Sequence, residues 1–294
     1  MKPSKDFDTL YEQYNQLMKV RGYRTGNGRM YPYAIEEFFS FLRERGYVEF
    51  HVNREDLTAY YVYLKTRPNK KREGLLSQST INHHLLAIRL LFDLLLQNGV
   101  YSSLPLIPKY LRGESTQQEI LSQEEIKALY DACEHPLERA LLSVGYGCGL
   151  RRSEMANLLV TDINLVSGFL IVRHGKGNKR REVPLSDTVI HDLRDYIQNG
   201  RINGTRRKVQ HLLVSPYGNA LSGKSLNNLL KVMISRVPTL AHRNISLHAL
   251  RRSIATHLAE NGAGIHFIKD FLGHTLIDTA QLYAIRRKRQ TKLY

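Results

Sequence analysis

The sequence predicts a mostly helical α+β protein with two domains. Apolar residues recur at helical spacing through most of residues 5–102. A stretch with prolines, a glycine and polar residues then interrupts this pattern up to residue 120. Beyond it, two short strand-like segments flank a glycine-containing tip, a pattern typical of a small antiparallel sheet. A chain of 294 residues with 42% hydrophobic residues is large enough to bury two cores.

The first domain, residues 1–105, is predicted to be a helical bundle. Each of its helices is followed by a glycine or a proline, which are common helix terminators. Ser79 or Thr80 is expected to cap the last and most apolar helix. The segments with helical spacing are 7–20, 31–46, 54–67 and 79–99, and they end near Gly22, Gly46, Pro68 and Gly99. A linker, 106–120, is expected to separate this bundle from a second domain, 121–294.

The second domain is predicted to be mixed. Ser122 and Glu125 form a capping-box pattern at the start of a helix over 121–133. Helices around a glycine-containing break are expected next, over 137–159. The strand-like segments GFLIVRH and REVPLS flank GKGNKR and predict a β-hairpin. Helices return from residue 188, with an interruption at 200–223.

Composition restricts the class of partner. The chain carries 43 Lys and Arg against 27 Asp and Glu, a net charge of +16, which favours a polyanion such as nucleic acid. No apolar run approaches the ~18 residues that span a bilayer, and the charged N-terminal segment lacks a signal core. The two cysteines, Cys133 and Cys148, are expected to be reduced core residues. We therefore expect a cytoplasmic protein without a membrane partner.

Several polar residues are candidates for chemistry, although each has an ordinary structural interpretation. His248 and Arg251 lie three apart on one predicted helix face, which is expected to face a cleft or solvent. Arg151 follows a glycine-rich turn, and Glu154 is placed to hold it. Lys176 lies at the hairpin tip, where a mobile turn is the commoner interpretation and the P-loop spacing is absent.

His274 and Tyr283 complete the candidates near the C-terminal end of the chain. Because the chain has 12 histidines and 17 tyrosines, either residue alone is no more than a packing or surface residue. The sequence has no HExxH and no CxxC pattern, so the histidines are not interpreted as a metal site. Arginines that neutralise a phosphate, histidines that hydrogen-bond it and a nearby tyrosine hydroxyl would together suit phosphodiester cleavage without a metal.

The order and spacing of these residues resemble the tyrosine recombinase (phage integrase) family. The segments GLRRSEM, GKGNKRREVPL, HALRRSIATHLAENG and LGHTLIDTAQLY are similar to the boxes of that family. The resemblance covers most of the chain and implies an N-terminal core-binding (SAM-like) domain and a C-terminal catalytic domain of simple Xer-like type. It implies no cofactor, a duplex DNA partner with two recombination sites, and a homotetramer or heterotetramer on DNA.

The resemblance also implies a role for each candidate. Arg151 and Arg251 would clamp the scissile phosphate, with Glu154 supporting the site from behind. His248 would assist proton transfer and His274 would hydrogen-bond the phosphate. Tyr283 would attack to give a 3′-phosphotyrosyl intermediate, and Lys176 would protonate the departing 5′-oxygen.

Some alternatives stay open at this level. Integrase, DNA invertase and chromosome-dimer resolvase all fit the resemblance, and a type IB topoisomerase-like enzyme or a non-cleaving DNA-binding protein are the rival functions. The family often has a histidine where this chain has Arg252, and the tail after Tyr283 is short. Tyr294 is a rival nucleophile outside the family spacing. Five polar residues on two predicted helices are candidates for DNA contact, or else solvated helix faces: Asn82, His83, Arg89, Asn227 and Lys231.

Overall fold

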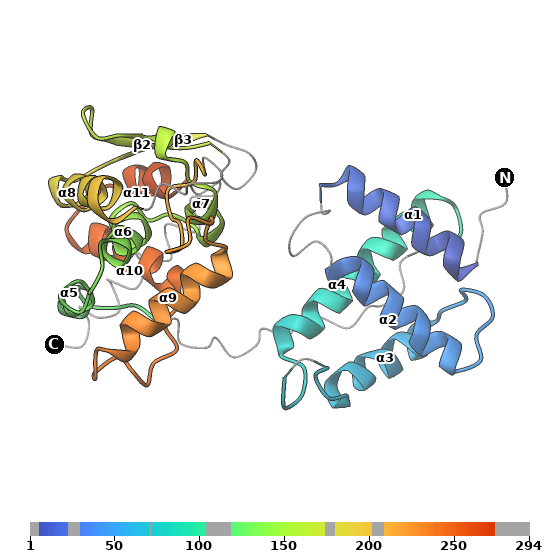
Figure 1. Ribbon diagram of the computed structural model, residues 1–294. Helices are drawn as coiled ribbons and strands as arrows, with labels where there is room; N and C mark the ends of the chain where they lie inside the picture. The colour runs from blue at the N-terminus through green and yellow to red at the C-terminus, as the bar shows by residue number, and fades with distance from the viewer. Residues whose placement is uncertain are drawn as a thin grey trace. The chain divides into compact units, whose positions relative to one another are not determined.

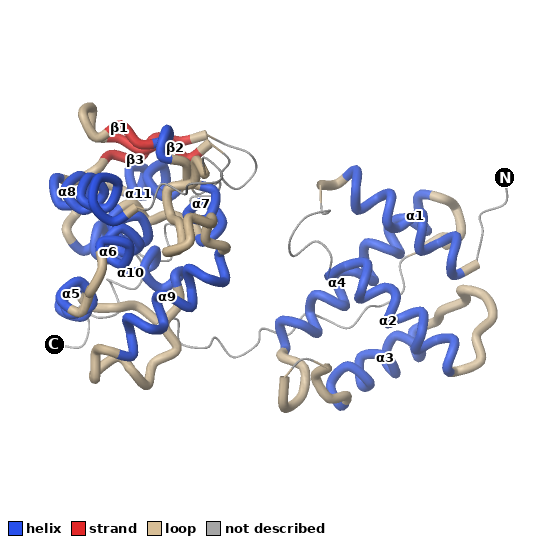
Figure 2. The backbone as a smooth tube through the Cα atoms, in the orientation of Figure 1, coloured by secondary structure: helices blue, strands red, loops and turns tan. Residues whose placement is uncertain are grey.

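The computed structural model describes residues 6–22, 30–70, 72–103, 119–173, 180–201 and 209–273. Its backbone contacts divide the chain into two compact units, Met1–Thr116 and Gln117–Tyr294. Within the described residues, helices dominate both units and a small antiparallel sheet lies in the second (Figures 1 and 2). The predicted fold class, mostly helical with a small sheet, is confirmed.

The regular elements of the first unit's described part are helices, as predicted, and an isolated antiparallel bridge joins Pro68 and Leu75. The predicted cap of α4, at Ser79 or Thr80, was wrong. Ser77, with an extended backbone, caps this helix by accepting from the Thr80 amide at 3.2 Å, so Ser79 and Thr80 lie in the first turn instead. The helices are α1 (Phe7–Val20), α2 (Met30–Glu44), α3 (Arg54–Thr66) and α4 (Gln78–Gln97).

The core of the first unit combines closely packed aromatic rings with one buried ionic group. Phe38 and Tyr60 pack with ring centroids 4.7 Å apart. Glu37, buried on α2, accepts from Arg67 Nη2 at 2.8 Å, which offsets the cost of burying its charge. His84 lies beside this pair, where burial, followed by the positive charge of Arg67, lowers the histidine pKa to about 4.

The second unit begins with a capping box, as predicted. The Glu125 amide donates to Ser122 Oγ at 3.2 Å, and the Ser122 amide donates to Glu125 Oε2 at 2.8 Å. The predicted glycine-containing break is a π-helical turn, Ser143–Gly147, between two helices. The helices of this unit are α5 (Gln123–Asp131), α6 (Pro136–Leu142), α7 (Arg152–Asn157), α8 (Asp187–Asp195), α9 (Gly223–Ser235), α10 (Leu247–Glu260) and α11 (Ile265–Leu272).

The predicted hairpin is present as β2 (Phe169–Val172) and β3 (Arg181–Pro184), antiparallel and with Val172 opposite Arg181. A third strand, β1 (Ile163–Asn164), pairs with β2 and was not predicted, because two residues are too short to show an alternating pattern. The hairpin tip, 174–179, lies outside the described residues. In β3, Arg181 and Val183 point to one face, since alternate side chains of a strand share a face.

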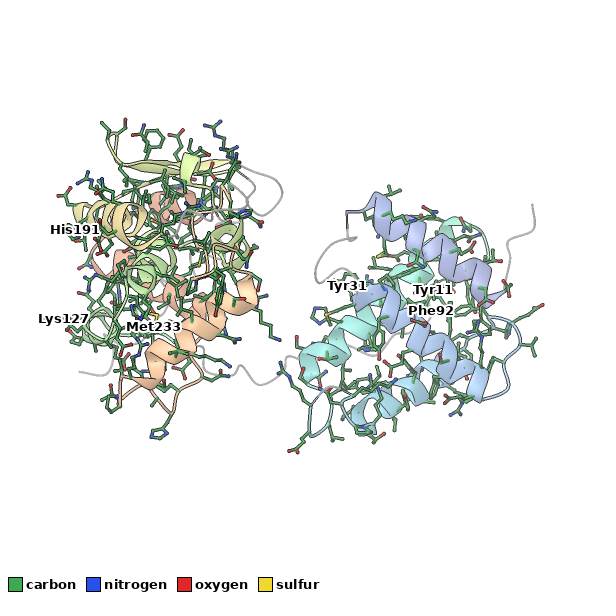
Figure 3. All side chains as sticks on the ribbon, viewed as in Figure 1. Tyr11, Tyr31, Phe92, Lys127, His191 and Met233 are labelled. Atoms are coloured by element: carbon green, nitrogen blue, oxygen red, sulfur yellow. The ribbon has the colours of Figure 1, made fainter. Side chains whose placement is uncertain are left out.

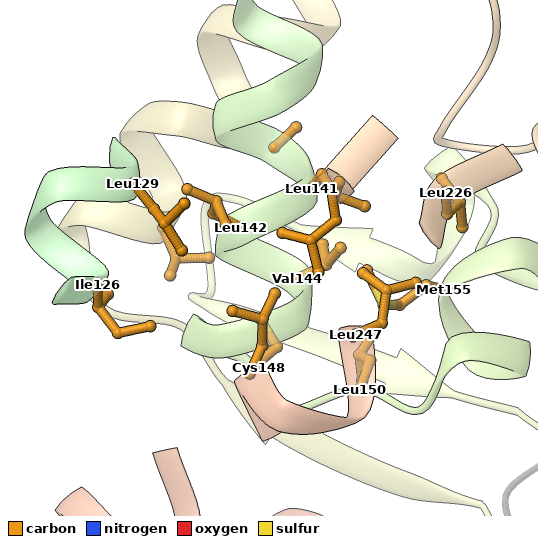
Figure 4. Packing of buried hydrophobic residues seen from close by; sticks show 14 of the residues in the cluster. Ile126, Leu129, Leu141, Leu142, Val144, Cys148, Leu150, Met155, Leu226 and Leu247 are labelled. Atoms are coloured by element: carbon orange, nitrogen blue, oxygen red, sulfur yellow. The ribbon is translucent and has the colours of Figure 1, made fainter. Parts of the chain in front are cut away.

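One hydrophobic core joins the helices of the second unit. Figure 4 shows leucines of α5 and α6 gathered around Val144 and Cys148, with Met155 of α7, Leu226 of α9 and Leu247 of α10 alongside. Cys148 is fully buried, and burial raises the pKa of its thiol to about 12, so it is an inert packing residue. Cys133 is half-buried and is also a free thiol. No helix in the described part of the chain is long and apolar enough to cross a membrane.

The end of the predicted linker contacts the second unit. Residues 104–118 lie outside the described ones, whereas Glu119 and Ile120 are described. Glu119 Oε2 accepts from Arg243 Nη2 at 2.6 Å, and the Leu121 amide donates to Ser253 Oγ at 2.8 Å. These bonds join the start of the second unit to residues more than a hundred positions further along the chain.

Candidate active site

Three of the six predicted reaction residues, Arg151, His248 and Arg251, lie in the described part of the second unit. The other three, Lys176, His274 and Tyr283, lie outside the described residues. His274 follows directly on Gly273, the last described residue of the chain. The contacts of Gly273 therefore show where the described chain ends, directly before the predicted residues His274 and Tyr283.

A tight glycine turn places Arg151 at the start of α7. Gly149 has a φ of +59°, a left-handed conformation that L side chains rarely adopt. A Cβ atom at this position would also lie 2.8 Å from Leu272 Cδ2 and 3.1 Å from Phe271 Cε1. Gly149 is therefore required both for the turn and for the close approach of this backbone to the last turn of α11.

Glu154 is the carboxylate around which the site is built. Its side chain is 2% exposed. Arg151 donates to it twice, through Nη1 to Oε1 at 2.7 Å and through the backbone amide to Oε2 at 2.8 Å. Arg181 of β3 donates through Nη1 to Oε1 at 3.0 Å and through Nη2 to Oε2 at 2.8 Å. The predicted contact between Glu154 and Arg151 is present, and Arg181 is a second partner that was not predicted.

The C-terminal end of α11 brings three arginines together. Arg181 Nε donates to the Phe271 carbonyl at 3.1 Å, Arg251 Nη2 to the Leu272 carbonyl at 2.5 Å, and Arg151 Nη2 to the Gly273 carbonyl at 2.8 Å. The last carbonyls of a helix have no partner within the helix and carry its partial negative charge, so guanidinium groups stabilise them. Three elements, α7, β3 and α10, thus position arginines at the residues that precede His274.

Arg251 is more deeply buried than the sequence suggested. The predicted face of α10 was expected to face a cleft or solvent, but the Arg251 side chain is only 2% exposed. Its Nη1 atom donates to the Gly149 carbonyl at 2.5 Å and lies 4.0 Å from Glu154 Oε2. The difference arises because the Gly149 turn and the end of α11 both pack against this face and supply carbonyl acceptors there.

The surrounding arginines control the charge of Glu154. Burial raises its pKa, but hydrogen bonds and charge from Arg181 and Arg151 outweigh that effect and lower the pKa to about 2. The carboxylate is therefore ionised throughout the physiological pH range. A depressed folded-state pKa contributes stability that is present above the unfolded value of 4.5 and is lost as the pH falls towards 2.

We expect the Glu154→Gln variant to be less sensitive to acid than the wild type. Between pH 6 and pH 3, the wild type should lose roughly 2 kcal/mol of unfolding free energy that the variant does not lose. Urea unfolding at the two pH values measures this difference. Glu182→Gln, which removes a carboxylate that is 63% exposed on the same sheet, is the matched control and should behave like the wild type. An equal loss in all three proteins would contradict the assignment.

His248 lies in the first turn of α10, where the residue as a whole is exposed but its imidazole ring is partly desolvated. This partial desolvation of the ring, followed by the positive charges of Arg252, Arg251 and Arg151, lowers the pKa of His248 to about 4. Its imidazole ring is therefore neutral at pH 7. A neutral ring can accept a proton, which is the state that a general base requires.

An NMR titration of the histidine ring protons tests this pKa. The resonance of His248, assigned by its loss in His248→Gln, should titrate near pH 4. Arg252→Met should raise this midpoint, because it removes a nearby positive charge. A midpoint at or above the ordinary histidine value of 6.5, or one that falls in Arg252→Met, would exclude the electrostatic explanation.

The three candidates for DNA contact on α4 differ in their surroundings. Asn82 is half-buried and its Oδ1 accepts from Gln78 Nε2 at 3.0 Å. His83 is half-buried, and its ring lies 6.3 Å from that of Tyr31, which projects from α2 beside α4 in Figure 3. Arg89 is exposed. Of these three residues, Arg89 therefore has the side chain most accessible to a phosphate.

The two candidates on α9 also differ in their exposure to solvent. Lys231 is exposed. Asn227 is half-buried, and its Oδ1 accepts from the Leu247 amide at 3.3 Å, so it satisfies one of the donors at the start of α10. Since the Ser246 side chain makes no capping bond there, Asn227 helps to fix the first turn of α10, which carries His248.

Arg181 is the residue of this site that sequence reasoning missed. The alternation of the strand could have identified it. In the segment REVP, alternate residues share a face, so Arg181 lies on the same face as the buried Val183. A charged residue on the inner face of a strand requires a partner. That partner, Glu154, lies 27 positions earlier in the chain and could not be identified from the strand alone.

The chain is similar to known proteins over most of its length. Residues 119–290 match the phage integrase family. The tyrosine recombinase XerD of Oceanobacillus iheyensis is 32% identical over 291 residues, covering 90% of this chain and 97% of that protein. The tyrosine recombinase XerA of Pyrococcus horikoshii is 29% identical, covering 93% of this chain and 88% of that protein.

A solved structure shows the same fold at lower identity. The integrase of the Tn1549 transposon, in complex with transposon right end DNA, matches with a TM-score of 0.75. The match covers 97% of this chain and 99% of that chain, at 17% sequence identity. The fold described above is therefore that of a known group of DNA-bound integrase structures.

Proposed function

The chain belongs to the phage integrase family and is a tyrosine-type site-specific recombinase, and from this premise we propose that it cleaves and rejoins DNA through Tyr283. The tyrosine oxygen attacks the scissile phosphorus and forms a 3′-phosphotyrosyl bond, while the bond from phosphorus to the 5′-oxygen breaks. The 5′-hydroxyl of a partner strand then reverses the reaction. Because the bond energy is stored in the intermediate, rejoining needs no ATP.

The observation that carries the proposal is the convergence of arginines on the backbone just before His274. A phosphodiester repels a nucleophile with its negative charge, and guanidinium groups offset this charge with planar, directional donors. Arg151 and Arg251 are the two that we assign to the phosphate, with His274 as a further donor. Preorganised donors of this kind stabilise the extra charge of a pentacoordinate transition state.

Proton transfers complete the scheme. His248, whose pKa of about 4 keeps it neutral, is assigned to assist removal of the Tyr283 hydroxyl proton. This assistance matters because an ordinary tyrosine has a pKa of ~10 and is protonated at neutral pH. Lys176, at the predicted hairpin tip, is assigned to donate a proton to the departing 5′-oxygen. One proton leaves the nucleophile and one reaches the leaving group, so the step is balanced.

Binding and assembly follow from the same premise. We assign residues 1–105 to a core-binding domain and 121–294 to a catalytic domain, joined by the linker 106–120. The net charge of +16 favours a grip on duplex DNA by both domains, with affinity that decreases as salt rises. Exchange between two sites brings two duplex segments together, and we propose a homotetramer or heterotetramer acting in the cytoplasm. Integration, excision, inversion and dimer resolution all use this same reaction.

A trapped covalent complex tests the proposal. Candidate DNA is supplied as nicked duplexes, in which the short fragment beyond the cleavage site dissociates and leaves the enzyme attached. With EDTA present and ATP absent, we expect an SDS-resistant adduct and a free 5′-hydroxyl end. Clear binding to a proven site without an adduct would leave a DNA-binding protein instead. Relaxation of a supercoiled plasmid without exchange between two sites would support a topoisomerase-like activity.

A further inference from the structure

We propose that Arg181 is a positioning residue of the cleavage site, which keeps Glu154 from neutralising the arginines that receive the phosphate. The inference rests on the proposed function and deepens it. Arg181 is the first residue of β3 and its side chain is 9% exposed. It lies five positions after Lys176 but is directed into the second unit, where Glu154 and the end of α11 are its partners.

The geometry of Arg181 is that of a fixed bridge. Its guanidinium spans both oxygens of Glu154, at 3.0 and 2.8 Å, and its Nε atom reaches the Phe271 carbonyl at 3.1 Å. A planar guanidinium offers these donors in a rigid fork, whereas an ammonium group cannot span them together. Gly273 passes so close that a Cβ atom there would lie 2.9 Å from Arg181 Cδ. Arg181 thereby joins β3, α7 and the end of α11.

The charges explain why this bridge matters for a phosphate. Arg151, Arg181 and Arg251 surround the single carboxylate of Glu154, with Arg251 Nη1 at 4.0 Å from it. Arg181 shares Glu154 with Arg151, so one negative charge is divided between two guanidinium groups and most of the positive charge of Arg151 and Arg251 stays available to a reacting phosphate. Without Arg181, the whole charge of the buried carboxylate would fall on Arg151, its remaining close partner, and the site would hold one positive charge fewer when negative charge develops.

The test uses single-turnover adduct formation on the nicked duplex at saturating enzyme, so that DNA affinity does not enter the rate. We expect Arg181→Met to slow adduct formation about 10- to 100-fold. Arg180→Met is the matched control, because Arg180 is adjacent to Arg181 and 66% exposed. This substitution removes the same charge and introduces the same side chain. Its rate should stay within about threefold of the wild type, as expected for a surface substitution.

A charge rescue separates positioning from a general structural defect. In Arg181→Met combined with Glu154→Gln, the carboxylate that Arg181 balanced is gone, so the double variant should react at least about tenfold faster than Arg181→Met alone. A variant damaged by lost packing would not recover in this way. Arg181→Lys, which keeps the charge but not the fork, covers the case in which the Met variant does not fold. It should be slower than the wild type by about three- to tenfold.

The outcomes distinguish this inference from the proposed function. An adduct with the wild type, together with an unimpaired Arg181→Met or no recovery in the double variant, would overturn the role of Arg181 and leave the cleavage proposal standing. A Lys variant that matches the wild type would also overturn it. Failure of the wild type to form any adduct on a proven site would overturn the proposed function and, with it, this inference.

Discussion

Tyr283→Phe should form no covalent adduct while it binds DNA as the wild type does. The substitution removes one oxygen, and in the proposed scheme that oxygen is the atom that bonds to phosphorus. In this scheme no other group is assigned to form that bond, so the expected effect is a complete loss and not a change in rate. The measurement is adduct formation on the nicked duplex, with binding followed separately by a mobility shift at matched salt.

Tyr294→Phe is the matched control for this experiment. It makes the same chemical change in the same C-terminal segment, eleven positions further along. Its adduct should form at the wild-type rate. If Tyr283→Phe kept the adduct and Tyr294→Phe lost it, the nucleophile would be Tyr294 and the spacing argument would be wrong. If neither variant lost it, the linkage would not be through either tyrosine.

Arg251→Met should lower both the stability of the protein and the rate of cleavage. The guanidinium makes buried hydrogen bonds to the carbonyls of Gly149 and Leu272, and methionine leaves both acceptors without it. Loss of charged hydrogen bonds at a buried site costs about 3 kcal/mol. For a unit of this size, that cost lowers the melting temperature by roughly 6–12 °C. Because the same group is assigned to the phosphate, cleavage should fall about 10³-fold.

Arg252→Met is the comparison that isolates the position of the charge. Arg252 follows directly on the same helix and is half-buried, so the variant has the same net charge and the same new side chain. Calorimetry should give a clearly smaller drop in melting temperature than for Arg251→Met, because Arg252 is less buried than Arg251. Equal destabilisation by the two substitutions would show that the Arg251 hydrogen bonds do not support the fold as described. Cleavage rates are measured below the melting temperature of Arg251→Met, so that unfolding of the variant does not contribute to the loss of cleavage.

The elements of the fold were largely predictable because their signals are local. The capping box of Ser122 and Glu125 depends on four consecutive residues, and the β2–β3 hairpin depends on two adjacent strand-like segments. Such patterns are set by backbone geometry within a few positions. The start of α4 was misplaced for the same reason. Three nearby residues, Ser77, Ser79 and Thr80, have similar side chains, and the backbone conformation selects the first.

The candidate site was predictable in its residue types and order, but not in its supporting contacts. Arg151, His248 and Arg251 could be identified from their place in the sequence, together with the predicted Lys176, His274 and Tyr283. The burial of Arg251 could not, because its acceptors lie 102 positions earlier and 21 positions later in the chain. A helix pattern shows which side chains share a face, and only packing shows what covers that face.

What the sequence by itself determined is the chemistry available: a basic, mostly helical chain with arginines, histidines and a tyrosine in the order that resembles tyrosine recombinases. What the tertiary structure alone decided is how three arginines share one carboxylate and the end of one helix. Arg151 reaches the Gly273 carbonyl across 122 positions, and Arg181 reaches the Phe271 carbonyl across 90. Such contacts depend on the close approach of α11 to the Gly149 turn, which is a property of the packed core and not of any local segment.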